Sequence, residues 1–309
     1  MLSSVIGALS DRMDSKFLTA YWLPAFVFTL GSLCTLGLAV GSSQLEAWIT
    51  DLDSVEQALG ALVIVLLISM LAFTLRAMTR PIAEVFAGIA LPDFLATVFR
   101  RGQARAKQRA ALLLRDSAQS GALPGGQDES AWLQSRFPTN DLALKPTLFG
   151  NLMASVGEHP RLAYSMEGVI WWPRLSPLLP SYFQDTLAGA QAPMMALLNL
   201  SVVFCGLAVL VILVGLFTAQ WLVTLLLGMG ALVLSRLTYR AAVSQATEVA
   251  SMLRVAFDLY RYDILDQLGK AHPVDLVAER TLWLGLTYEV LGRGTCSPVP
   301  STDGAADLS

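Results

Sequence analysis

The residues with the greatest capacity for chemistry are two histidines and the carboxylates close to the first of them. Glu158 precedes His159 directly, Glu167 follows a little further on, and both His159 and His272 stand before a proline. A carboxylate beside an imidazole can act in general acid–base catalysis, and at a membrane surface such a cluster would suit an enzyme that acts on lipid. The simpler interpretation is a histidine in a turn, because neither histidine has the spacing of a metal site or a catalytic triad.

Familiar sequence signatures of catalysis are absent. The chain contains no phosphate-binding Gly-Lys loop, no His-Glu-x-x-His pair and no Gly-x-Ser-x-Gly turn. Its three cysteines, Cys34, Cys205 and Cys296, have no zinc-binding spacing and suggest no disulfide. We therefore predict a protein that is not an enzyme and that binds neither a cofactor nor a metal.

The apolar residues are too numerous and too concentrated for a soluble domain. Of the 309 residues, 54% are hydrophobic and 15% are charged, whereas about a quarter of a soluble domain is charged. Three segments contain no charged side chain: Phe17 to Leu45, Gln57 to Leu75 and Thr186 to Ser235. Since a helix crosses a bilayer in about 20 residues, the first two segments fit one crossing each, and the third, divided near 217–221, fits two.

The basic residues predict the orientation of these crossings. The connection from Glu46 to Glu56 holds four carboxylates and no Lys or Arg, whereas basic residues follow the second and fourth crossings. Loops rich in Lys and Arg stay on the cytoplasmic side. We expect a bacterial inner (plasma) membrane protein with both termini in the cytoplasm. The first crossing is too long, and its leading residues too balanced in charge, for a cleaved signal peptide.

The predicted fold is an all-α integral membrane protein with four transmembrane helices in two hairpins and a helical cytoplasmic domain. The expected order is a cytoplasmic N-terminus (1–16), a first hairpin (17–80, with crossings at about 18–41 and 57–77), a cytoplasmic or interfacial helical region (81–190), a second hairpin (191–239, with crossings at about 196–217 and 221–239), a cytoplasmic helical extension (240–292) and a disordered tail (293–309).

The segment "EGVIWWPRLSPLLP", residues 167–180, combines two tryptophans, an arginine and three prolines. Tryptophan rings favour the headgroup layer, and an arginine can reach lipid phosphate from there. This favours an interfacial elbow that contains Trp171, Trp172 and Arg174. Because tryptophan is mostly buried, an aromatic cluster inside the cytoplasmic domain is an equally good interpretation.

The extension after the fourth crossing has the pattern of a long amphipathic helix. Apolar residues recur at steps of three and four, whereas Arg254 and Asp258, four residues apart, suit a polar face. Such a stripe packs against its own domain or against a neighbouring subunit. The stripe comprises Ala246, Val249, Leu253, Phe257, Tyr260, Ile264 and Leu268.

Three short elements resemble a group of uncharacterised bacterial multi-pass membrane proteins. They are a Gly-Asn pair within "TLFGNL" (147–152), a Trp-Pro-Arg-Leu run (172–175) and a Phe-Asp-Leu-x-Arg helix (257–261). The resemblance covers the chain from about Lys16 to Leu291 and carries no established activity. It implies only that these elements belong to one architecture. As structural or interface candidates we name Trp171, Trp172, Arg174, Phe257, Asp258 and Tyr260.

Two classes of function fit these features. The first is an oligomeric channel or membrane-perturbing effector, gated by a small signalling ligand or a protein. Four crossings need further copies to enclose a pore. No ionisable residue lies deep in the bilayer, which fits a pore controlled by a hydrophobic constriction. The second is a membrane-anchored scaffold that presents its cytoplasmic domain to a partner protein. The expected partners are the lipid bilayer, further copies of the chain, and a cytoplasmic protein or small ligand. Nucleic acid is not expected, since aromatic residues do not interleave with the basic ones.

Overall fold

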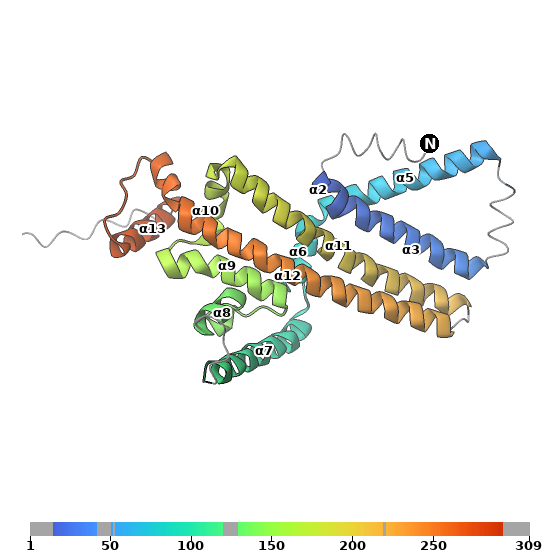
Figure 1. The fold of residues 1–309 in the computed structure, drawn as a ribbon, viewed down its shortest axis with the longest axis horizontal. Helices are drawn as coiled ribbons and strands as arrows, with labels where there is room; N and C mark the ends of the chain where they lie inside the picture. The colour runs from blue at the N-terminus through green and yellow to red at the C-terminus, as the bar shows by residue number, and fades with distance from the viewer. Residues whose placement is uncertain (1–14, 42–50, 52, 120–128, 219–220, 293–309) are drawn as a thin grey trace, which may run out of the picture.

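The protein is an elongated arrangement of helices (Figure 1). The structure, a computed structural model, describes residues 15–41, 51, 53–119, 129–218 and 221–292. Every regular element in these ranges is a helix. The predicted tail (293–309) and nearly all of the predicted N-terminal segment lie outside the described residues.

Within these described ranges, four helices are long and apolar enough to cross a membrane, as the sequence predicts. The first crossing starts with a π-helical turn that continues directly into an α-helix. These elements are η1 (Leu18–Trp22) with α3 (Leu23–Val40), α5 (Ser54–Ala77), α11 (Ser181–Thr218) and α12 (Trp221–Gln267). Two of the four, α11 and α12, are much longer than a bilayer requires.

The apolar parts of these helices lie side by side in one row, which we call the apolar half (Figure 1). In this row α5 packs on α3, α3 on α11, and α11 on α12. Gly31 lets α3 approach Leu207 of α11, since a Cβ there would lie 2.8 Å from that side chain. Helix α5 leaves large apolar residues such as Leu66 and Met70 exposed. Lipid chains would cover such a surface.

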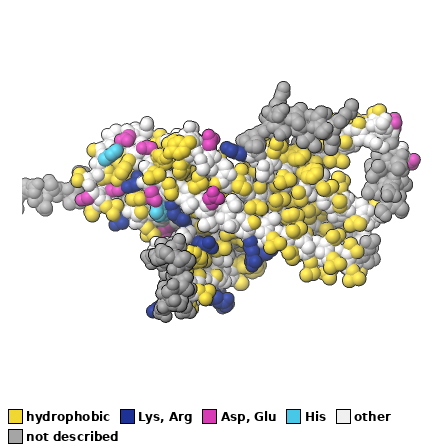
Figure 2. Space-filling view, viewed as in Figure 1, with side chains coloured by type: hydrophobic (Ala, Val, Ile, Leu, Met, Phe, Trp, Pro, Cys, Tyr) yellow, Lys and Arg dark blue, Asp and Glu magenta, His cyan; other side chains and the backbone are white. Residues whose placement is uncertain are grey.

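Most of the remaining helices gather around the N-terminal end of α11 and the C-terminal end of α12 and form the charged half (Figure 1). On the face shown in Figure 2, hydrophobic side chains cover the apolar half, and most charged side chains lie on the other half. Helix α6 joins the two halves (Figure 1). The helices are α6 (Thr79–Phe86), α7 (Asp93–Gln119), α8 (Glu129–Arg136), α9 (Leu148–Tyr164), α10 (Gly168–Leu175) and α13 (Leu276–Val290), with short 3₁₀ turns η2 (Asp141–Ala143) and η3 (Ser176–Leu178).

Two helix ends differ from the sequence-based expectation. Helix α5 starts at Ser54 rather than near residue 57, because Asp53 caps it and the Glu56 side chain accepts a hydrogen bond from the Asp53 backbone N–H. Helix α9 continues through Pro160 to Tyr164, although a proline inside a helix usually ends or kinks it. A proline in the last turn deprives only one carbonyl of its donor, so the helix tolerates it there.

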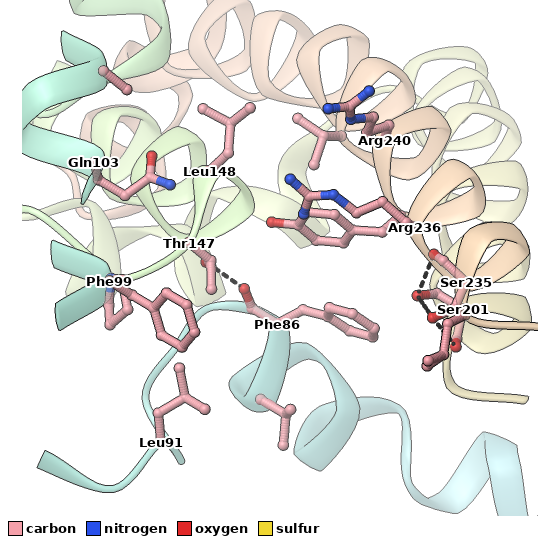
Figure 3. Close-up of a pocket in the computed structure, with 16 residues that line it drawn as sticks. Phe86, Leu91, Phe99, Gln103, Thr147, Leu148, Ser201, Ser235, Arg236 and Arg240 are labelled. Carbon is pink, nitrogen blue, oxygen red and sulfur yellow. Dashed lines mark hydrogen bonds between the residues drawn. The ribbon is translucent and has the colours of Figure 1, made fainter. Parts of the chain in front are cut away.

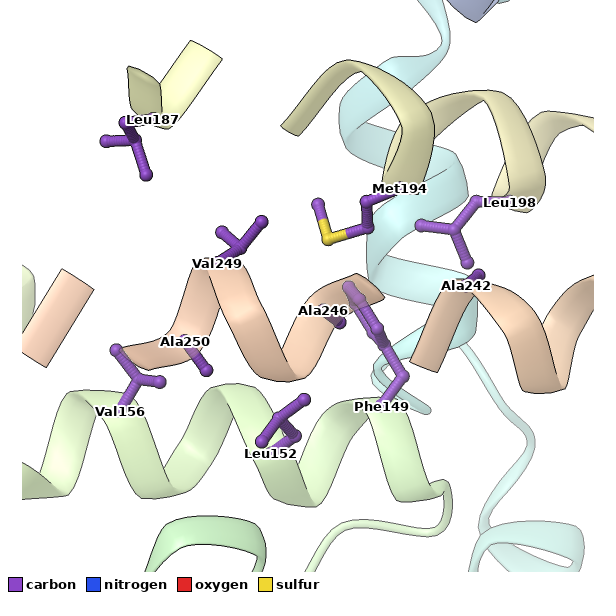
Figure 4. Close-up of a cluster of buried hydrophobic side chains, with 10 residues drawn as sticks. All are labelled: Phe149, Leu152, Val156, Leu187, Met194, Leu198, Ala242, Ala246, Val249 and Ala250. Carbon is purple, nitrogen blue, oxygen red and sulfur yellow. The ribbon is translucent and has the colours of Figure 1, made fainter. Parts of the chain in front are cut away.

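Helix α12 packs through small side chains in the first part of the charged half (Figure 4). Ala242, Ala246 and Ala250 are fully buried and recur every four residues. Their small size lets α9 and α11 approach α12 from two sides, with Leu152 of α9 and Leu198 of α11 in the same core. A second core lies further along α12 and joins it to α10 and α13.

The apolar stripe predicted on α12 therefore packs within the chain. Phe257 and Ile264 are buried in the second core, and Val249 is buried in the first. Only Leu268, at the far end of the stripe, is largely exposed. The stripe is thus not an argument for a second copy of the chain.

A proline and an asparagine connect the first crossing to the third. Pro24 has no N–H, so it cannot donate to the carbonyl of Ala20 four residues earlier, and η1 widens there. The buried amide of Asn199 on α11 donates to this carbonyl instead, at 2.7 Å. Polar side chains of membrane helices commonly form such bonds between helices.

Replacing Asn199 by Leu should lower the free energy of unfolding by about 1–2 kcal/mol, because the Ala20 carbonyl would be left buried without a donor. Unfolding in detergent, followed by circular dichroism, measures the change. Thr29→Val is the matched control, since the Thr29 hydroxyl bonds only to Ala25 of its own helix. Equal stability of Asn199→Leu and Thr29→Val would contradict the role of this bond.

Candidate functional site

The polar centre of the charged half is the carboxylate of Asp258. One of its oxygens lies 2.8 Å from His159 Nε2 and also accepts a hydrogen bond of 2.8 Å from the Tyr164 hydroxyl. Both partners belong to α9, so a single side chain of α12 holds two points of that helix. We call Asp258, His159 and Tyr164 the Asp258 junction.

The junction continues the alanine row of α12. Counting in fours from Ala250 leads to Arg254 and then to Asp258, so the face that packs on α9 changes from small and apolar to charged. Arg254 donates to the Ser135 carbonyl at 2.6 Å and to the Ser155 hydroxyl at 2.9 Å. The predicted polar face of this helix therefore contacts α8 and α9 and is not a solvated surface.

A buried ion pair next to the junction attaches α13. Arg261 donates to Glu279 at 2.6 Å, and the Glu279 carboxylate also accepts hydrogen bonds from Tyr262 at 3.0 Å and Trp283 at 3.3 Å. Glu279 is 3% exposed. The Arg261 guanidinium lies 4.1 Å from the centre of the Tyr164 ring, which connects the ion pair to the junction.

Burial and hydrogen bonding shift the pKa values of this network. Burial raises the pKa of Tyr164 to about 12, and the hydrogen bond to Asp258 adds to the effect. Burial also raises the pKa of Glu279, but the bonds from Arg261, Trp283 and Tyr262 outweigh it and leave this pKa below its ordinary value. For Arg254, burial lowers the pKa and the charge of Asp258 opposes the shift.

The candidate residues for lipid chemistry have structural partners. Glu158 is buried, and its two oxygens accept hydrogen bonds from the Thr139 backbone N–H at 2.6 Å and from Arg161 at 2.8 Å. Glu158 and His159 line an open pocket of about 440 Å³. Exposed Glu167 is not part of this lining. The structure thus brings together two of the three residues, Glu158 and His159. The Glu158 carboxylate bonds to the loop that precedes α9.

The Trp-rich segment forms part of the second core. Trp171 is fully buried, donates to the Thr287 hydroxyl at 3.0 Å and packs edge-on against Trp283 of α13. Arg174 is exposed and lies beside the Trp171 ring. The part of α12 from Arg236, its first charged residue, to Phe257 in the second core is about 30 Å long. The second core therefore lies far along α12 from the border with the apolar half. The structure therefore favours the buried aromatic cluster over the elbow at the headgroups.

The other aromatic candidates join α10, α11 and α12. The rings of Trp172 and Phe257 have centroids 5.9 Å apart. Tyr260 packs against Phe183 of α11, and its hydroxyl lies 2.7 Å from that of Tyr182. All six residues predicted to matter for structure or interfaces thus lie in or beside the second core and the Asp258 junction.

The elements that carry the resemblance also contact one another or the same helix. The Trp-Pro-Arg-Leu run meets the Phe-Asp-Leu-x-Arg helix through the Trp172 and Phe257 rings, and Asp258 reaches α9. Asn151, from the Gly-Asn pair, is fully buried at the start of α9 and accepts a hydrogen bond from the Lys145 backbone N–H. A Cβ on Gly150 would lie 2.2 Å from the Ala87 carbonyl oxygen. These elements maintain the packing of α9.

The fold and the site together define an all-helical protein with four candidate membrane-spanning helices, two of which continue into a folded charged half. Its polar centre consists of interhelical bonds. Among the described residues, no group of three or more His, Cys, Asp or Glu side chains could hold a metal ion. No family model, curated protein or solved structure matches the chain.

Sequence reasoning did not identify Tyr164, Arg261 and Glu279 as members of the network. Tyr164 lies beyond Pro160, in the last turn of a helix that continues through this proline. Arg261 is three residues after Asp258 and so lies on the same face of α12, which was the available signal. Glu279 belongs to a separate helix, and its approach to Arg261 depends on the turn between α12 and α13.

Replacing Asp258 by Ala should reduce the free energy of unfolding by about 1–3 kcal/mol, since His159 and Tyr164 would both lose a charged partner. Asp258→Asn should cost less, because the amide oxygen can still accept a bond. Denaturant unfolding in detergent, followed by tryptophan fluorescence, measures both. Glu248→Ala, on the exposed side of α12, should stay within about 0.5 kcal/mol of the wild type. The junction would be unimportant if Asp258→Ala behaved like this control.

The depressed pKa of Glu279 makes the stability dependent on acid. A carboxyl group with a lowered folded-state pKa stabilises the protein above its ordinary pKa of 4.5, and this stabilisation is lost as the pH falls further. Glu279→Gln should be less stable than the wild type by about 3 kcal/mol at pH 7. The difference should narrow between pH 4.5 and pH 3. Thermal unfolding of both proteins across this range is the measurement, and parallel curves would disprove the assignment.

Proposed function

We propose that the protein is a non-enzymatic, four-span protein of the bacterial inner membrane that holds a helical cytoplasmic domain at the membrane surface as a scaffold for a partner protein. In this proposal the charged half is the cytoplasmic domain and both termini lie on its side. Basic residues flank the apolar runs at this end of the crossings, in agreement with the positive-inside rule. They are Lys16, Arg76, Arg80, Arg236 and Arg240.

The continuity of α11 and α12 carries the proposal. Each helix leaves the apolar half without a break and then contributes to both cores of the charged half. A domain built on two such helices is held in a fixed position relative to the bilayer, as a scaffold requires. The structural partners of Glu158 support a non-enzymatic role.

An oligomeric channel or membrane-perturbing effector is the second candidate. The row of helices favours it in one respect, because a row has two broad apolar faces that further copies could cover. At the distal ends of the crossings, the pocket among α3, α11 and α12 has a volume of about 20 Å³, enough for one water and too small for a continuous path through one copy. Any pore would therefore lie between copies.

Reconstitution distinguishes the two candidates. Purified protein in liposomes should produce no more ion flux than protein-free liposomes, and light scattering of nanodiscs should give a monomer or dimer.

A photo-crosslinking residue at Val169 or Val277, 84% and 74% exposed in the charged half, should capture a cytoplasmic protein. The matched position Leu66 of α5, 60% exposed, should capture lipid. A ring of four or more copies that conducts ions would overturn the scaffold in favour of the channel.

A further inference from the structure

A pocket of about 700 Å³ opens at the border between the two halves (Figure 3). Its walls come from four places along the chain: the end of α6 and the segment after it, α7, the loop before α9, and the facing sides of α11 and α12. At this border the charged side chains of α12 begin. Lipid headgroups would lie at this level of a spanning protein.

One end of the pocket is apolar and needs no polar ligand. Leu232 and Phe99 contribute apolar surface and are each 49% exposed. Ser201 and Ser235, visible on the right of Figure 3, satisfy each other: each hydroxyl donates to the other residue's carbonyl, at 3.0 and 2.9 Å. This end of the pocket is suited to a hydrocarbon chain.

The other end of the pocket is basic. Arg236 and Arg240 stand one turn apart on α12 and both line the pocket (Figure 3). Among the described residues, neither guanidinium group has an ion pair or a hydrogen-bond partner, and Arg236 only approaches the Tyr239 ring, at 5.9 Å. No Asp or Glu is among the residues that line the pocket.

Two arginines outside this pocket, one at the border and one in the charged half, have carboxylate partners. Arg80 pairs with Glu84 and Arg261 with Glu279. Two neighbouring arginines without a carboxylate form a local excess of positive charge, and guanidinium groups bind phosphate oxygens in a bidentate manner. Gln103 adds an amide that faces the same space (Figure 3).

We infer that this pocket binds an anionic phospholipid. Its phosphate is held by Arg236 and Arg240, and one acyl chain lies along Leu232 and Phe99. The combination of an apolar end and a basic end, in one cavity at headgroup level, matches a lipid better than a soluble anion. The site goes beyond the proposed scaffold function and does not depend on it.

Lipid retention tests the inference. The full-length protein is placed in nanodiscs of phosphatidylcholine with a small fraction of phosphatidylglycerol, and bound lipid is counted by native mass spectrometry. One basic residue near a bilayer surface contributes about fivefold in affinity. The double variant R236Q/R240Q should therefore bind phosphatidylglycerol roughly 25-fold more weakly, and the single variant R240Q about fivefold more weakly. R236K/R240K should retain most of the binding.

R80Q is the matched control, since Arg80 lies at the same border but outside the pocket and pairs with Glu84. It should bind phosphatidylglycerol as the wild type does. Melting in pure phosphatidylcholine nanodiscs shows whether each variant is folded. Unchanged retention by folded R240Q and R236Q/R240Q would overturn the inference. Inorganic phosphate that displaces the lipid at equal concentration would also overturn it, in favour of a soluble anion.

Discussion

The structure depends on the close contact of α12 with α9 and α11 at its row of alanines. Side chains the size of Ala242, Ala246 and Ala250 keep three helices within packing distance over about two turns, and a larger side chain at these buried positions would strain the core or push the helices apart. This contact brings α9 alongside α12 in a parallel direction. As a result, Ser155 and His159 of α9 meet Arg254 and Asp258 of α12, and both pairs are separated by 99 residues in the sequence.

The same face of α12 then changes from alanine to charge, and this change defines the polar network. Beyond Ala250, the residues that face α9 are Arg254 and Asp258, and both find partners there. Arg261 extends the network to Glu279 on α13. Buried ion pairs gain little net stability because of the cost of desolvation, but they penalise any other pairing of the helices. The alanines thus provide close packing, and the charges select one register.

Much of the architecture could be predicted from the sequence because its causes are local. Runs without charge mark the four spans, and the absence of proline between residues 194 and 272 predicts that α12 continues far beyond the bilayer. The Trp-rich segment was harder, since burial and headgroup contact both suit tryptophan. Whether this segment is buried or contacts headgroups depends on how far α11 and α12 extend and on Trp283, which comes from another helix. The pairing of Arg261 with Glu279 likewise depends on tertiary packing, which periodicity along one helix cannot reveal.

The continuous helix α12 links the two halves mechanically, whether the protein acts as a scaffold or as a channel. An α-helix is stiff along its axis. In the apolar half α12 packs on α11, which contacts α3, which in turn contacts α5. In the charged half the same helix α12 bears Asp258 and its junction with α9. A partner that displaced α9 would remove His159 and Tyr164 from the Asp258 carboxylate. The least costly response is a rotation or tilt of α12, because breaking the helix would expose backbone groups in an apolar environment. Such a motion would reach Arg236, Arg240 and the lipid pocket before it reached the distal end of the spans. The border between the halves is therefore the place where events in the charged half and the state of the bilayer act on the same helix.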